Sequence, residues 1–240
     1  MDNEDRLNFN FQVPPSPTSD LVELADEQQE RRLLGKLQAA GNDPGQALWD
    51  LAQFYKRRGK LDLAIEILNH LLTLAPTLEH KAQIILTLGQ TAENSKDFEL
   101  AVRFYRQALS IEPCNPGHWY FIHNNLGFSL NQLGKYAEGE DYCRRAIAIS
   151  EEWPNAFKNL GLALVGQCRY HEAAEAFVRA TQVNASDARS LGHLEGLISE
   201  HPELEYDFAS RLRECRDAVR VAREAVEKVQ EQWRKVPKME

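Results

Sequence analysis

The sequence lacks several features that define common protein classes. No apolar run approaches the roughly 18 residues that a membrane-crossing helix requires. The first thirty residues carry eight acidic residues against one base, Arg6, so no ordinary secretory signal is expected. Only four cysteines occur and none forms a Cys-x-x-Cys pair, which argues against disulfides and structural zinc. These absences predict a cytoplasmic protein that does not insert into a membrane.

Residue patterns that carry chemistry are also missing. The sequence has no glycine-rich phosphate loop, no Gly-x-Ser-x-Gly elbow and no metal-ligand spacing. The stretch HEAAE at 171–175 comes nearest to a zinc-protease helix, but Glu175 stands where the second histidine must be. The net charge of −8 argues against nucleic-acid binding, because a phosphate backbone would be repelled. We therefore predict no enzymatic activity, no cofactor, no metal site and no nucleic-acid partner.

The sequence does contain a repeated segment. NLGFSLNQLGKYAEGEDYCRRA at 125–146 returns as NLGLALVGQCRYHEAAEAFVRA at 159–180, and residues 87–108 resemble both. A leucine, followed by a small residue, stands thirteen positions before a second small residue in every copy. The second small residues lie 37, 38 and 34 positions apart and are Ala64, Ala101, Gly139 and Ala173. Such self-similarity at a nearly fixed period indicates a repeat architecture.

The spacing inside each copy indicates helices. Apolar residues recur at intervals of three and four, which marks one face of an α-helix. Each copy has two such stretches, separated by a short polar break such as NSKD at 94–97. One helix pair of this size cannot bury its apolar faces alone, so neighbouring pairs must stack. The sequence therefore predicts an all-α fold of stacked helix pairs.

This pattern resembles the tetratricopeptide repeat, TPR. The similarity covers four units, at 45–78, 82–115, 120–153 and 154–187. It implies an α-solenoid, which is a right-handed superhelix of antiparallel helix pairs. Gly139 and Cys143 depart from the small and aromatic residues that are usual at their positions in the family.

The two ends of the chain differ from the repeats. Residues 1–18 contain prolines and acids without a period and predict a disordered tail, and 19–41 predict an N-terminal capping helix. Residues 187–202 predict a degenerate fifth first helix. A long helix is expected over 203–237, where apolar residues recur every seven positions. This helix is expected either to cap the stack or to pair with a second copy or another partner.

The resemblance also implies a binding surface, because the first helix of each TPR unit lines the concave side of the stack. We expect peptide contacts from these lining positions: Trp49, Gln53, Leu86, Gln90, Phe121, Asn124, Asn125, Phe128, Lys158, Asn159, Leu162, Arg189 and His193. Carboxamides can donate and accept hydrogen bonds with the main chain of an extended peptide, and the aromatic and aliphatic groups offer apolar contacts. The alternative is that the asparagines only connect adjacent helices and that the phenylalanines only pack on neighbouring units.

The predicted function is that of a non-enzymatic scaffold or adaptor that binds a peptide or protein segment in the concave groove. Some TPR co-chaperones hold a C-terminal carboxylate with a clamp of lysines, asparagines and arginine. That clamp is incomplete here, because Asn124 and Phe128 stand where lysine and asparagine are expected. Two further roles stay open: a self-associating structural subunit whose groove or end is covered by its C-terminal helix, with a homodimer through 203–237, or an accessory subunit of an enzyme complex.

Overall fold

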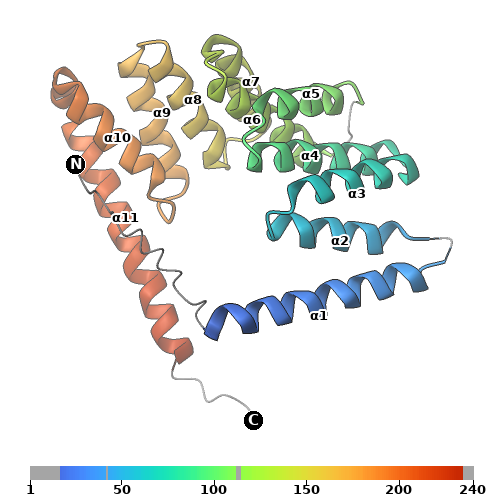
Figure 1. Ribbon diagram of the computed structural model, residues 1–240. Coiled ribbons are helices and arrows are strands. Elements are labelled where there is room, and N and C mark those ends of the chain that lie inside the picture. Colours follow the sequence, from blue (N-terminus) through green and yellow to red (C-terminus); the bar gives the residue numbers. More distant parts are fainter. Residues whose placement is uncertain (1–16, 42, 112–114, 235–240) are drawn as a thin grey trace, which may run out of the picture.

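The computed structural model describes residues 17–41, 43–111 and 115–234, and over these ranges the chain is helical without any strand (Figure 1). The helices are α1 (Pro17–Ala39), α2 (Gly45–Arg57), α3 (Leu61–Leu74), α4 (Leu78–Asn94), α5 (Phe98–Leu109), α6 (Pro116–Gln132), α7 (Tyr136–Ile149), α8 (Pro154–Gly166), α9 (Tyr170–Val183), α10 (Arg189–Glu200), the short 3-10 helix η1 (Pro202–Leu204) and α11 (Glu205–Arg234). The predicted all-α class is confirmed.

The helices stack as hairpins in chain order. Helix α2 packs against α3, α4 against α5, α6 against α7 and α8 against α9, and each pair packs on the next. The first helices α4, α6 and α8 contact one another along the stack more closely than the second helices α5, α7 and α9 do. The more closely spaced row forms the inner side of a bend, so the first helices line the concave face. This is the predicted solenoid, with a long C-terminal helix at its end (Figure 1).

Small residues let the two helices of a hairpin approach closely. A Cβ atom added at Gly89 in α4 would lie 2.3 Å from the ring of Tyr105 in α5. The same addition at Gly161 in α8 would lie 2.5 Å from the ring of Phe177 in α9. Both rings are fully buried, so the large side chain of the second helix fills the space that the glycine leaves.

The turn inside each hairpin requires a left-handed backbone at the same place. The residue five positions before the small residue of α3, α5, α7 or α9 has a positive φ: 70° at Gly59, 60° at Lys96, 72° at Gly134 and 59° at Cys168. Two of the four repeats place glycine there, which adopts this conformation without strain. The other two hold a side chain in a region that L-residues disfavour.

Helix α1 covers the first hairpin. Leu33 is buried against α2 and α3, together with Tyr55 and Ala64. The Tyr55 hydroxyl donates a hydrogen bond of 2.6 Å to Glu30, and Arg58 pairs with Asp26. The predicted tail at 1–18 lies outside the described residues except for its last two positions, which begin α1.

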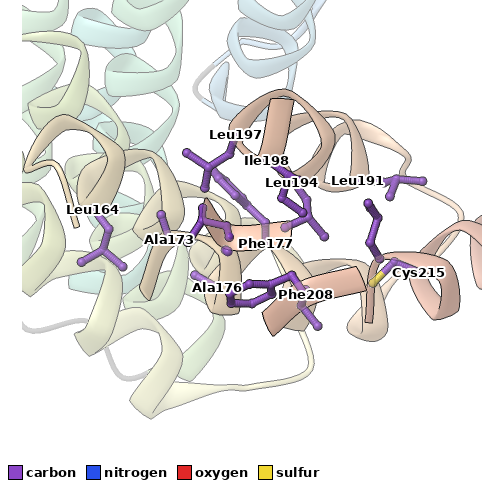
Figure 2. Packing of buried hydrophobic residues seen from close by; sticks show 14 of the residues in the cluster. Leu164, Ala173, Ala176, Phe177, Leu191, Leu194, Leu197, Ile198, Phe208 and Cys215 are labelled. Carbon is purple, nitrogen blue, oxygen red and sulfur yellow. The ribbon is translucent and has the colours of Figure 1, made fainter. Parts of the chain in front are cut away.

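The other end of the stack is covered by α11, which contacts α9 and α10. Figure 2 shows this cluster, in which Phe208 of α11 lies near Phe177 of α9, and Cys215 of α11 lies near Leu191 of α10. The buried part of α11 ends at Val219, and the residues after it lie exposed except for the partly covered Ala222. Among the described residues, no helix combines the length and the apolar character that crossing a membrane requires.

Candidate functional site

The predicted contact residues differ widely in exposure. Leu86, Asn124 and Asn159 are buried, whereas Phe121, Arg189 and His193 are exposed. The remaining seven are partly exposed: Trp49, Gln53, Gln90, Asn125, Phe128, Lys158 and Leu162. Ten of the thirteen side chains therefore keep at least part of their surface in solvent, and three are buried.

The buried asparagines connect neighbouring first helices. Asn159 of α8 donates a hydrogen bond of 3.0 Å from Nδ2 to Oδ1 of Asn124 in α6, and Asn124 donates one of 2.8 Å to Oδ1 of Asn125. Asn131 of α6 donates to the backbone oxygen of Asn159 at 2.8 Å. In a buried setting these bonds fix the register of α6 against α8. They leave Asn125, at the edge of the network, as the asparagine nearest to solvent.

A second polar cluster, the Glu93 cluster, joins the first three repeats. The Ser129 hydroxyl of α6 donates a hydrogen bond of 2.8 Å to Glu93 Oε1 of α4, and Lys56 Nζ of α2 donates one of 3.1 Å to Gln90 Oε1. Burial raises the pKa of the Glu93 carboxyl to about 7, against the hydrogen bond from Ser129 and the charge of Lys56. Burial also lowers the pKa of Lys56, although Glu93 opposes this. Glu93 is not among the thirteen predicted contacts: its helical spacing from Gln90 places it on the lining face, but nothing local signals its burial.

Basic side chains gather at the far end of the concave face, on α8 and α10. The cationic end consists of Lys158, Arg189 and His193. Burial and then Arg189 lower the pKa of Lys158, and burial, Lys158 and Arg189 lower the pKa of His193. Arg189 is held by Asp187, whose carboxylate accepts its Nε at 2.8 Å. The described residues offer Lys158 no ion pair of its own within 4.0 Å, so its charge is partly desolvated and weakly compensated.

Aromatic side chains form the wall between the third and fourth repeats. Phe121 of α6 stacks on Trp153 at 5.0 Å between ring centroids, and Trp153 also contacts the edge of Tyr120 at 4.3 Å. The Tyr120 hydroxyl donates to the backbone oxygen of Trp153 at 3.1 Å. Between the second and third repeats, Phe128 of α6 meets Phe98 of α5 edge to face at 6.1 Å. Both predicted phenylalanines thus pack on neighbouring aromatic rings while keeping part of their surface in solvent.

Trp49 lies apart from these groups, at the first hairpin. It lines a pocket of about 620 Å³ together with Leu71 and Leu74 from the end of α3 and Ile84 of α4. Gln46, Gln83 and Asp43 are among its polar lining residues. Among the described residues, no group of three or more histidine, cysteine, aspartate or glutamate side chains is arranged to hold a metal ion.

Comparison with curated proteins finds relatives that share the repeats. The chain is 31% identical over 107 residues to small glutamine-rich tetratricopeptide repeat-containing protein 2 of Mycosarcoma maydis, which covers 45% of this chain and 29% of that protein. It is 19% identical over 144 residues to the Hsp70-Hsp90 organising protein of Plasmodium falciparum, which covers 52% of this chain and 56% of that protein. In both cases the matched region is well short of the relative's full length.

Solved structures with the same fold are also found. BtubC (BKLC) from P. vanneervenii superposes with a TM-score of 0.67 at 19% identity, over 85% of this chain and 92% of that one. MamA (residues 41 to the end) from Desulfovibrio magneticus RS-1 superposes with a TM-score of 0.55 at 19% identity, over 79% and 95%. At these identities the similarity establishes the fold. The family model of the tetratricopeptide repeat matches residues 43–111 and 121–186, more than half of the sequence, and the chain therefore belongs to the tetratricopeptide-repeat family.

Proposed function

We propose that this protein is a non-enzymatic adaptor that binds an acidic segment of a partner protein along its concave face. The observation that carries the proposal is the cationic end. Lys158 is partly buried and lacks a close counter-ion among the described residues, and Arg189 and His193 lie beside it. A partner carboxylate placed here compensates the charge of Lys158 and accepts charge-assisted hydrogen bonds from it.

The rest of the concave face suits an extended peptide. Gln53, Gln90 and Asn125 keep part of their side chains in solvent and can pair with a peptide main chain irrespective of its sequence. Leu162 and the Phe121–Trp153 stack offer apolar contacts next to the cationic end. Because the whole chain carries a net charge of −8, a local positive site discriminates strongly in favour of a correctly placed acidic group.

The named relatives are consistent with a protein partner. One is called an Hsp70-Hsp90 organising protein, and another, from Aspergillus fumigatus, is called a heat-shock protein cognate co-chaperone, with 27% identity over 121 residues. The chain departs from the co-chaperone clamp at Asn124 and Phe128, and Asn124 is occupied by its bond to Asn159. Recognition through Lys158 and α10 therefore uses a different arrangement of cations from that clamp.

The test is a binding titration with labelled peptides, followed by fluorescence anisotropy. The probes are a ten-residue peptide with four acidic residues before a free C-terminal carboxylate, its amidated form and a basic peptide of the same length. We expect the acidic probe to bind, and Lys158→Ala to weaken it by about tenfold or more, since a charge-assisted hydrogen bond contributes about 1.5–3 kcal/mol. Arg189→Ala weakens it as well.

The matched control is Arg103→Ala, which removes an exposed arginine from α5, a second helix outside the concave row. This variant should bind like the unmodified protein. Equal binding of the acidic and basic probes, or undiminished binding by Lys158→Ala, would show that the cationic end is not the recognition site.

A further inference from the structure

Helix α11 has two halves with different surroundings. Its first half buries Phe208, Leu212, Cys215 and Val219 against α9 and α10. In its second half, which we call the free arm (220–234), the same seam continues through Ala222, Val226, Val229 and Trp233. Val226 is 47% exposed, Val229 50% and Trp233 73%. In Figure 1, α11 runs well past the end of the α9–α10 pair. The apolar seam therefore continues beyond the part of α11 that packs against α9 and α10.

We propose that the free arm pairs antiparallel with the free arm of a second copy of this chain. The seam is self-complementary in that direction. If Val226 of one copy lies opposite Val229 of the other, the same register sets Ala222 opposite Trp233, and two-fold symmetry repeats both layers. A small residue thus faces the largest one, and two valines face each other, so every layer has a similar volume.

A hollow in the surface of the protein matches this register. It has a volume of about 150 Å³ and lies where α11 leaves the stack, lined by Ala185, Ser186 and Ala188 and by Val219, Ala222, Arg223 and Val226 of α11. The Trp233 side chain of the second copy, opposite Ala222, fills this hollow. The most exposed seam residue of one copy is in this way covered by a recess of the other that is lined mainly by alanine and valine.

The lengths of the two arms fit the same register. Arg234, the last described residue of α11, comes alongside Val221 of the other copy, two residues beyond the last buried position, Val219. Over the described residues the two arms therefore overlap without entering either stack.

Parallel pairing fits the seam poorly. It would set Ala222 against Ala222 and Trp233 against Trp233, which leaves an underfilled layer at one end of the seam and an overfilled layer at the other. It would also bring the two solenoids to the same end of the pair. In the antiparallel register, Arg223 faces Gln230 across the seam and Ala225 faces Gln232, so no like charges oppose each other.

The interface is small, and this sets the expected affinity. Two arms of about four turns each bury less than the roughly 1,200 Å² of a standard interface, so we expect a weak, reversible dimer. Sedimentation equilibrium of the full chain between about 1 µM and about 500 µM covers that regime. We expect a monomer–dimer equilibrium within this range.

Two matched valines provide the decisive comparison. Val229 is 50% exposed and lies on the seam, whereas Val221 is 57% exposed and lies off it. Val229→Ala should raise the dimer Kd by about tenfold or more, because symmetry removes its methyl groups from two layers at once. Val221→Ala should leave the Kd unchanged, and Trp233→Ala should have the largest effect. A chain that stays monomeric throughout, or equal effects of the two valine variants, overturns the proposal.

Direction is tested by cross-linking. Ala222→Cys and Trp233→Cys are made separately in a background in which Cys114 and Cys168 are serine, which leaves the buried Cys143 and Cys215. Under mild oxidation, antiparallel arms form a disulfide only when the two variants are mixed. Disulfides within each variant alone would indicate parallel arms and would overturn the proposed pairing.

Discussion

The Glu93 cluster predicts a specific pH dependence of stability. In the folded protein, burial raises the pKa of the Glu93 carboxyl to about 7, from an ordinary value of 4.5. Between these two values, the folded chain keeps a proton that the unfolded chain releases. The free energy of unfolding therefore falls as the pH rises from about 4.5 to about 7, and the stabilisation is lost above that. The difference between the two pKa values corresponds to about 3 kcal/mol.

Replacing Glu93→Gln removes this dependence while retaining the local hydrogen bond. The amide oxygen of glutamine can still accept from the Ser129 hydroxyl, which lies 2.8 Å from Oε1. Glutamine is uncharged at every pH, so it carries no penalty for burial of a carboxylate. We expect the variant to be more stable than the unmodified protein by about 3 kcal/mol at pH 8, and nearly equal to it at pH 4.5.

The assay is urea unfolding followed by circular dichroism at a series of pH values, and the quantity of interest is the difference between variant and unmodified protein. Glu66→Gln, at an exposed position of α3, is the control and should show no comparable trend. Lys56→Met tests the cause: the charge of Lys56 lowers the pKa of Glu93, so its loss should move the transition to higher pH. A difference between Glu93→Gln and the unmodified protein that is the same at pH 5 and pH 8 would refute the reasoning.

Three further predictions concern stability, and each is measured by the same unfolding assay. Gly127→Ala should destabilise the protein by about 1–3 kcal/mol, because the added Cβ would lie 2.9 Å from a backbone oxygen of α7. Gly192 has open space around it, so Gly192→Ala should stabilise the protein by up to about 1 kcal/mol. Glu140→Ala should cost about 2 kcal/mol, because the buried Glu140 carboxylate accepts from Arg169 at 2.8 Å. Cys168→Gly should stabilise the turn by about 1 kcal/mol, since the residue has a φ of 59°; a loss of stability would contradict the strain argument.

The fold was predictable because its determinants repeat along the chain. The small residues at positions such as Gly89 and Gly161, and the large residues at Tyr105 and Phe177, recur with a nearly fixed spacing, and each pair meets inside its own hairpin. Local periodicity therefore carries most of the architecture. The end of the buried part of α11 at Val219 was not predictable, because the length of the α9–α10 hairpin sets it and the seam itself continues unchanged.

The positions of the candidate site residues could be predicted from the sequence better than the contacts that their side chains make. Helical spacing places Asn124, Asn159 and Phe121 on the first helices, but their partners lie about 30 residues or more away along the chain. Asn124 and Asn159 bond to each other, and Phe121 lies on Trp153, which precedes the next first helix. The elevated pKa of Glu93 likewise depends on burial by neighbouring helices, which no single repeat encodes. Side-chain roles that arise between repeats are thus invisible to a reading of one repeat at a time.

Because the helices contact mainly their neighbours along the stack, local unfolding of one helix affects mainly the helices next to it. Helix α1 is attached to the first hairpin, mainly through α2, so fraying at that terminus leaves the hairpins beyond it with their own neighbours intact. The cationic end on α8 and α10 lies several hairpins away from such fraying. Proteolytic trimming of the first helix would therefore shorten the solenoid while sparing the surface where an acidic ligand is expected to sit.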